Sequence, residues 1–297
     1  MKKYKPKTRE ELRSLVIAES LNLGDIDTSA ITDMSELFYK SERKDFSGIE
    51  SWDVSNVTDM SNMFWSAENF NQPLNSWNVS NVKNMRGMFY GAKSFNQPLD
   101  NWDVSNVTDM GNMFVGATNF NQSLDKWNVS SVTYMDKMFK EATNFNQPLN
   151  KWNVSSITDM FGMFWNAENF NQPLNSWNVS NVENMSHMFW NAKKFNQPLD
   201  NWNVSKVTDM NWMFAGATSF NQPLNSWDIS KVKNMSHMFV EAKKFNQPLD
   251  NWNVSNVKYM NEMFAGCTNF NQPLDNWKDK LSQKLAGVIA KNQKIKI

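Results

Sequence analysis

A 25-residue sequence occurs nine times in succession between Trp52 and Asn276. The first copy begins Trp-Asp-Val-Ser-Asn-Val-Thr-Asp-Met, and its last motif is Phe70-Asn-Gln-Pro-Leu74, just before Trp77 begins the second copy. A repeat of fixed length predicts a solenoid, in which each repeat buries its apolar residues against its neighbours. Positions within the repeat are numbered below from its tryptophan, so Trp52 is at position 1.

The apolar positions of the repeat predict two kinds of local structure. Positions 9, 12, 13 and 16, which are Met85, Met88, Phe89 and Ala92 in the second repeat, have the spacing of an amphipathic helix. Positions 1 and 3 alternate with polar residues, as in a short strand with one buried face. We therefore expect an α/β solenoid in which each rung contains one short parallel β-strand and one short helix.

Both ends of the repeat array differ from its middle. Thr8 and Glu11 form a capping-box pattern ahead of an apolar face, residues 26–51 form a divergent repeat, and Trp277 begins a rung that changes into a second amphipathic segment. We predict an N-terminal helical cap over residues 1–25, a solenoid of one divergent and nine regular repeats over residues 26–276, and a C-terminal helical cap over residues 277–297.

The composition argues against several classes of partner. The chain has 30 basic and 30 acidic side chains, so no global field attracts it to nucleic acid or to an anionic membrane. The basic amino terminus is not followed by an apolar stretch, and no segment is long enough to insert into a membrane. The location stays open at this point between the cytoplasm and export by a signal outside this sequence.

Catalytic and metal-binding motifs are missing from the sequence. The two histidines, His187 and His237, both stand at position 11, two rungs apart, which is too far for one zinc ion. The sequence contains no phosphate-binding glycine motif and no paired zinc-ligand cysteines. We expect a protein that is not an enzyme and that has no cofactor and no metal site.

Large aromatic side chains at the outer positions of the repeat are the first candidate binding surface. Position 14 lies away from the predicted apolar stripe of the helix, so its side chains are expected to face solvent, as is the side chain at position 11. Exposed aromatic side chains often anchor protein interfaces. An equally weighted alternative is that they fold over the helix of the next rung. The candidates are Trp65, Tyr90, Trp165, Trp190 and Trp212.

A row of polar residues at position 2 is the second candidate surface. A serine follows two residues later in every repeat, so the two positions offer a regular polar ladder to an extended peptide or glycan. The favoured alternative is that these side chains bond to neighbouring rungs. The invariant Asn-Gln pair at positions 20 and 21, such as Asn71 and Gln72, is also interpreted as an amide ladder. The candidates at position 2 are Asp53, Asn78, Asp103 and Asp228.

The repeat also resembles known families. The spacing Leu74-x-x-Trp77-x-Val79 is similar to the strand of leucine-rich repeats, and the whole repeat resembles the BspA-like family, in particular its branch of unknown function in mycoplasma surface lipoproteins. The resemblance implies a right-handed, leucine-rich-repeat-like solenoid and adhesion at the cell surface. Cys267 occupies a position where related repeats carry a cysteine, so we expect it to be a core residue.

The function predicted from the sequence is therefore binding or adhesion to a protein or glycan partner without catalysis. The alternative is an intracellular scaffold or a self-assembling structural protein with no small ligand. Self-association through the outer aromatic side chains is compatible with both.

Overall fold

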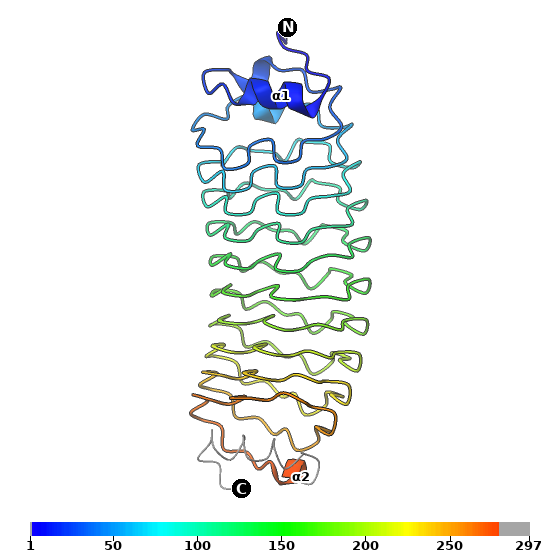
Figure 1. The fold of residues 1–297 in the computed structure, drawn as a ribbon, viewed down its shortest axis with the longest axis vertical. Helices are drawn as coiled ribbons and strands as arrows, with labels where there is room; N and C mark the ends of the chain where they lie inside the picture. The colour runs from blue at the N-terminus through cyan, green and yellow to red at the C-terminus, as the bar shows by residue number, and fades with distance from the viewer. Residues whose placement is uncertain (1, 279–297) are drawn as a thin grey trace. The chain divides into compact units, whose positions relative to one another are not determined.

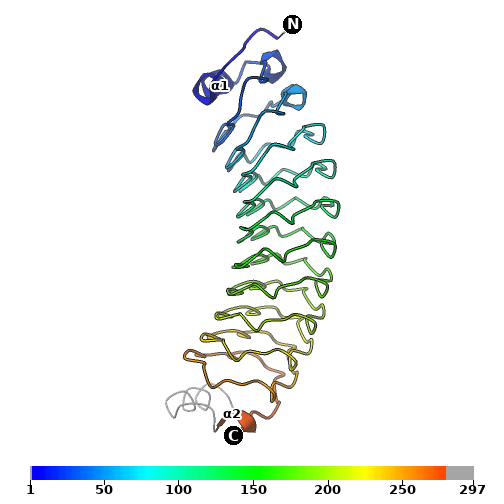
Figure 2. The ribbon, with the colours of Figure 1, turned by 90° about the vertical axis from the view of Figure 1, so that its right-hand side faces the viewer.

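The computed structural model describes residues 2–278 of the chain. The chain consists of two compact units, Met1–Trp152 and Asn153–Ile297. Within each unit, successive repeats form rungs that stack on one another, as Figures 1 and 2 show in two orthogonal views. Each unit is thus a repeat solenoid, as the sequence predicts. Its rungs, however, are built differently from the prediction.

The first unit begins with helix α1 (Arg9–Val16), which starts where the capping box predicts a helix. The Thr8 hydroxyl accepts a 3.2 Å hydrogen bond from the backbone N–H of Glu11, which satisfies one free amide of the first turn. Arg43 is buried and donates its guanidinium hydrogens to the carbonyls of Val16 and Ala18. These bonds attach the end of α1 to the divergent rung, which also contains the 3₁₀ turn η2 (Ile49–Ser51); a similar turn, η1 (Leu23–Asp25), precedes it.

The predicted strand at positions 1 to 3 is not formed in the described residues. Backbone turns occupy both sides of it: Trp77 N–H bonds to the carbonyl of Leu74, and Val82 N–H bonds to that of Val79. The parallel pairing between rungs lies instead at position 8, where single bridges join Asp59 to Asn84 and Asn84 to Asp109. The second unit repeats this register, with bridges at Asp159, Asn184, Asp209, Asn234 and Tyr259.

The predicted helix at positions 9 to 16 is also wrong. In this segment the N–H groups of odd positions donate to the next rung; Met60 bonds to the carbonyl of Asn84 at 2.9 Å and Phe64 bonds to that of Met88 at 2.9 Å. The N–H groups of positions 12, 14 and 16 donate three residues back, as Met63 does to Met60, and that of position 10 donates to the side chain at position 8. An α-helix requires bonds four residues back, and this alternation removes them.

Left-handed backbone at positions 11 and 15 produces this alternation. Asn62 has φ of 55° and Gly91 has φ of 64°, and the same sign recurs in the second unit at His187 and Gly216. Glycine and asparagine accept this conformation most readily, since a side chain at Cβ otherwise crowds the following carbonyl. The result is a chain of tight turns that are hydrogen-bonded to the next rung.

The interior of each unit consists of side-chain columns that continue from rung to rung. Phenylalanines at position 13 stack at 5.6 Å between ring centroids, as Phe64 does on Phe89, and each also packs on the phenylalanine at position 19 of its own rung. Methionines at positions 9 and 12 are fully buried in the inner rungs. The Trp102 indole N–H donates a 2.9 Å bond to the carbonyl of Leu74, 28 residues earlier, so even the buried polar atom at position 1 has a hydrogen-bond partner.

The C-terminal cap prediction falls mostly on residues 279–297, which lie outside the described residues. The described part ends in the short helix α2 (Asp275–Lys278). None of the helices described in residues 2–278 is both long and apolar enough to span a membrane.

Candidate functional site

Aromatic side chains form a band in the second unit, called here the aromatic band. Trp165 and Trp190, both at position 14, stack at 4.5 Å between centroids and 15° between planes. Trp190 lies 4.8 Å from Trp212, and Trp212 stacks on His237 at 4.4 Å. All of these rings are partly exposed. The aromatic band comprises Phe161, Trp165, His187, Trp190, Trp212 and His237.

The left-handed turn at position 11 explains how the aromatic band forms. It brings position 11 of one rung against position 14 of the rung before, so His187 lies 5.5 Å from Trp165 and Trp212 lies 4.8 Å from Trp190. Trp212 and His237 adopt φ of 58° and 60°, a conformation that costs bulky residues about 1 kcal/mol or more. A strained backbone therefore positions part of the aromatic band.

The first unit contains a smaller version of the same arrangement. Trp65 stacks on Tyr90 at 3.6 Å and 2° and lies 6.0 Å from Tyr39. A Cβ atom added to Gly87 would lie 3.0 Å from the Trp65 ring, so the glycine at position 11 leaves the space that the indole fills. The five aromatic candidates therefore fall into two groups, Trp65 with Tyr90 and Trp165 with Trp190 and Trp212.

The prediction that position 14 faces solvent is wrong in this structure. Trp65, Tyr90, Trp165 and Trp190 are half-buried, and the smaller residues Val115 and Ala215 are 1% exposed. The alternative, that the side chains fold over the neighbouring rung, describes their packing better. Part of each large ring remains accessible, since none of these residues is fully buried.

The polar residues at position 2 bond within their own rung. The Asp53 carboxylate accepts hydrogen bonds from the backbone N–H of Ser55 at 3.0 Å and from its hydroxyl at 2.7 Å. The same turn holds Asn78 against Ser80, at 3.2 Å to its N–H and 2.8 Å to its hydroxyl. These bonds from serine are the main cause that lowers the pKa of Asp53, Asp103 and Asp228. These side chains therefore bond within their own rung and not, as the favoured alternative expected, to the neighbouring rungs. The residues at position 2 are exposed.

The invariant Asn-Gln pair does form a ladder between rungs. The Asn71 side-chain oxygen accepts bonds from the backbone N–H of Asn96 at 2.9 Å and from the Gln97 amide at 3.2 Å. In the second unit Asn196 accepts from Asn221 and Gln222 in the same way. This prediction is confirmed, and the role of the pair is structural.

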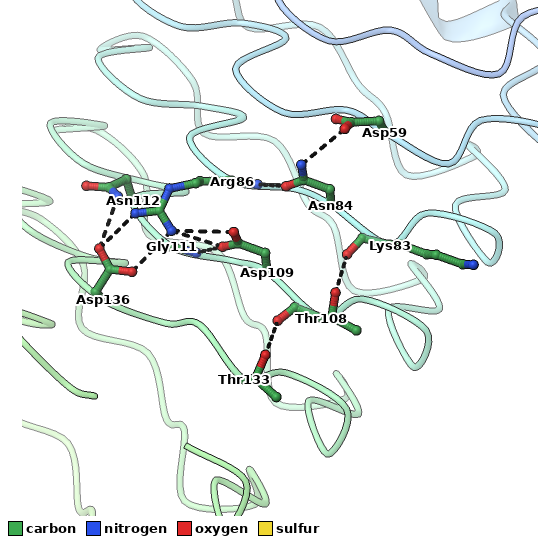
Figure 3. A network of polar contacts seen from close by, with 10 residues as sticks. All are labelled: Asp59, Lys83, Asn84, Arg86, Thr108, Asp109, Gly111, Asn112, Thr133 and Asp136. Atoms are coloured by element: carbon green, nitrogen blue, oxygen red, sulfur yellow. Dashed lines mark hydrogen bonds and ion pairs between the residues drawn. The ribbon is translucent and has the colours of Figure 1, made fainter. Parts of the chain in front are cut away.

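A polar network in the first unit is not foreseen from the sequence (Figure 3). The Arg86 guanidinium bonds to Asp109 at 3.2 Å and to Asp136, two rungs away, at 3.0 Å. Gly111 lies between them, and a Cβ atom there would approach the guanidinium to 2.3 Å. Burial is the main cause that raises the pKa of Asp109, and it outweighs the opposing effect of Arg86. The sequence does contain a signal for this network, because position 10 holds arginine, glycine and aspartate in three consecutive repeats.

The described residues contain no group of three metal-ligating side chains. Trp212 lies between the two histidines, 6.3 Å from His187 and 4.4 Å from His237. Cys267 is buried as expected of a core residue, and burial raises the pKa of its thiol to about 12. A thiol with that pKa is protonated at neutral pH and is a poor nucleophile.

Comparison with known proteins identifies the repeat but not an activity. No functionally curated protein matches the chain. Among solved structures, an internalin from Listeria monocytogenes is similar to this chain, with 11% sequence identity and a TM-score of 0.29. The similarity covers 89% of this chain and 73% of the internalin. A family model described as "Mycoplasma protein of unknown function, DUF285" matches residues 14–118, 96–202 and 191–296. Since these matches together span nearly the whole chain, the protein belongs to the DUF285 family.

Proposed function

We propose that this protein binds a macromolecular partner without catalysing a reaction and that the aromatic band of the second unit is its main contact surface. The observation that carries the proposal is the continuous contact from Trp165 through Trp190 to Trp212, at centroid distances of 4.5 and 4.8 Å. Clustered, partly exposed tryptophans are enriched among the residues that dominate binding energy.

The packing of the rings favours a protein over a neutral glycan at this surface. Because the Trp165 and Trp190 planes are 15° apart and 4.5 Å between centroids, their faces largely cover each other. A sugar that binds by stacking needs an open ring face. Ring edges and indole N–H groups suit the side chains and backbone of a protein.

The test measures binding to purified extracellular-matrix proteins and to a panel of neutral glycans. The variant Trp165→Ala/Trp190→Ala is expected to weaken binding to a matrix protein by roughly tenfold or more, as for truncation of interface tryptophans. Val240→Ala, at the same position of the same unit but outside the aromatic band, is the matched control and should bind like the parent. Thermal unfolding of both variants checks that the fold is kept.

A structural, self-assembling role is the second candidate, because the same surface is suited to a second copy of the chain. Sedimentation velocity of the parent and of the double variant distinguishes the two. If the double variant matches the parent in both matrix-protein binding and sedimentation, the aromatic band is not the contact surface and the proposal fails.

A further inference from the structure

The second unit has a groove lined by lysines at different repeat positions from the aromatic band. Its lining residues are Thr208, Lys231, Lys233, Asn256 and Lys258, and its volume is about 420 Å³. Lys231 stands at position 5 of the repeat, whereas Lys233 and Lys258 stand at position 7 of consecutive rungs. We call this feature the lysine groove.

The backbone between rungs fixes the spacing of the lysine groove. Lys233 N–H bonds to the carbonyl of Thr208 at 2.8 Å, and Lys258 N–H bonds to that of Lys233 at 2.8 Å. Parallel neighbours in such a ladder are about 4.8 Å apart. Lys206 extends the position-5 column by one rung and donates to the side-chain oxygen of Asn181 at 2.7 Å. The lysine side chains thus start from an ordered two-column array.

The charge of the lysine groove is local and is not balanced by ion pairs. The whole chain has equal numbers of basic and acidic side chains, so the cluster does not follow from a basic composition. Within residues 153–278, no ion pair joins Lys206, Lys231, Lys233 or Lys258 to a carboxylate, whereas Lys193 pairs with Glu168 at 2.8 Å. The nearby carboxylates are Asp228 and Glu183, which stands at position 7 one rung before Thr208. Hydrogen bonds from Ser230 are the main cause that lowers the pKa of Asp228, and the charge of Lys231 contributes to it.

The residues that line the lysine groove also indicate which class of anionic ligand suits it. Its lining residues are three lysines, one threonine and one asparagine, with no aromatic or purely aliphatic side chain among them. Peptide recognition generally uses apolar pockets or strand addition in addition to charge. A chain of sugars that carry sulfate or carboxylate groups needs only cations and polar hydrogen-bond partners.

We infer that the lysine groove binds an anionic polysaccharide, with successive acidic groups held by lysines of successive rungs. This surface is separate in sequence position from the aromatic band, so either can fail in experiment without the other. Attraction to a repeated polyanion would be strongest at low ionic strength, because salt screens exposed charges over about 10 Å at 0.1 M.

The test uses immobilised heparin as the anionic polysaccharide, neutral dextran as the uncharged one and poly-glutamate as the acidic peptide. The variant Lys231→Gln/Lys233→Gln/Lys258→Gln is expected to lose roughly tenfold or more of its heparin affinity, since each exposed ion pair contributes only a small factor. The control Lys194→Gln/Lys243→Gln/Lys244→Gln removes the same charge from another part of the same unit and should change affinity less than twofold. Both sets of lysines are exposed, so the melting temperature should not change in either variant.

Three results would overturn the inference. The first is an absence of heparin binding by the parent at 0.05 M salt. The second is an equal loss of heparin affinity in the groove and control variants, which would mean that heparin responds to the net charge of the protein and not to this particular site. The third is equal affinity for poly-glutamate, which would assign the lysine groove to an acidic protein.

Discussion

The side-chain amide of Asn75 donates a 3.0 Å hydrogen bond to the carboxylate of Asp100, one rung later. Lys126 binds the other oxygen of the same carboxylate at 2.8 Å. In the second unit Asn175 pairs with Asp200, and Asn225 pairs with Asp250. In each of these pairs an asparagine at position 24 is followed by an aspartate one rung later, so the two side chains are a complementary donor and acceptor between rungs.

This pairing predicts a specific response to charge. Asn75→Asp should lower the free energy of unfolding by about 1 kcal/mol, because it replaces a hydrogen bond with two adjacent carboxylates. The double variant Asn75→Asp/Asp100→Asn places the donor on the other residue and should recover part of that loss. Urea unfolding at neutral pH measures both, and equal stability of the single and double variants would show that the pair is not coupled.

A second prediction concerns the left-handed turns. Gly116 has φ of 65°, and a Cβ atom there would have only ordinary contacts, the nearest at 3.7 Å from Gly91. Gly116→Ala should therefore cost about 1–2 kcal/mol through backbone strain alone. The control is Asn62→Gly, at another left-handed position with φ of 55°, which should change stability by only a few tenths of a kcal/mol. A neutral Gly116→Ala variant would contradict the turn geometry.

The Arg86 network gives a third prediction. Arg86→Ala leaves Asp109 and Asp136 close together without their shared cation and should lower stability by about 1–2 kcal/mol at pH 7. The loss should shrink in acid as Asp109, whose pKa is raised mainly by burial, becomes protonated. The added substitution Asp109→Asn should recover much of the loss, as a double-mutant cycle in urea would show. Additive effects of the two substitutions would exclude the coupling.

Acid stability gives a fourth prediction. The pKa values of Asp53, Asp103 and Asp228 are lowered mainly by hydrogen bonds from serine, and those of Asp100 and Asp125 are lowered mainly by bonds from lysine. Such groups contribute stability fully above their unfolded pKa of about 3.9 and lose it as pH falls through the lower folded values. Asp109 has the opposite effect on the pH dependence of stability, because its pKa is raised, but it is a single group and the five aspartates above outnumber it.

The free energy of unfolding should therefore decrease steadily below about pH 4. Chemical unfolding at pH 7, 5, 4 and 3 measures this trend. In the variant Asp53→Asn/Asp103→Asn/Asp228→Asn, which carries the asparagine that other repeats have at position 2, the decrease should be smaller. An identical pH dependence in this variant would show that the serine-bonded carboxylates do not control it.

The sequence predicts most of the buried positions correctly, although position 14 is an exception. Positions 9, 12, 13 and 16 do point inward, as Met85, Met88, Phe89 and Ala92 show with no exposed surface. It was not sufficient to predict the backbone, because consecutive three-residue turns place the same positions inward as an α-helix does. The frequent glycine and asparagine at positions 11 and 15 were the available signal for left-handed turns. Trp212 and His237 at position 11 obscured it.

The candidate surfaces were predicted only in part, for a similar reason. The outer aromatic residues can be identified from the sequence because positions 11 and 14 differ between repeats, whereas the core positions differ little. Their stacking depends on how position 11 of one rung approaches position 14 of the rung before, which the sequence does not show. Arg86 and Asp136 are 50 residues apart, and only the two-rung reach of the guanidinium connects them. Predicting such contacts requires knowing how neighbouring rungs are aligned, and the residue pattern of a single repeat does not show this alignment.

The backbone bonds between rungs at positions 9, 11, 13 and 15 use no side-chain atom. His187, Trp212 and Gly87 all occupy position 11 with the same sign of φ, and His187 N–H and Gly87 N–H both bond to the next rung at 2.9 Å. The identity of the outer side chain can therefore change from rung to rung while the main chain keeps the same path. The backbone holds the rungs together and the side chains form the outer surface, so a substitution at position 11 can change that surface while the hydrogen bonds between rungs are kept.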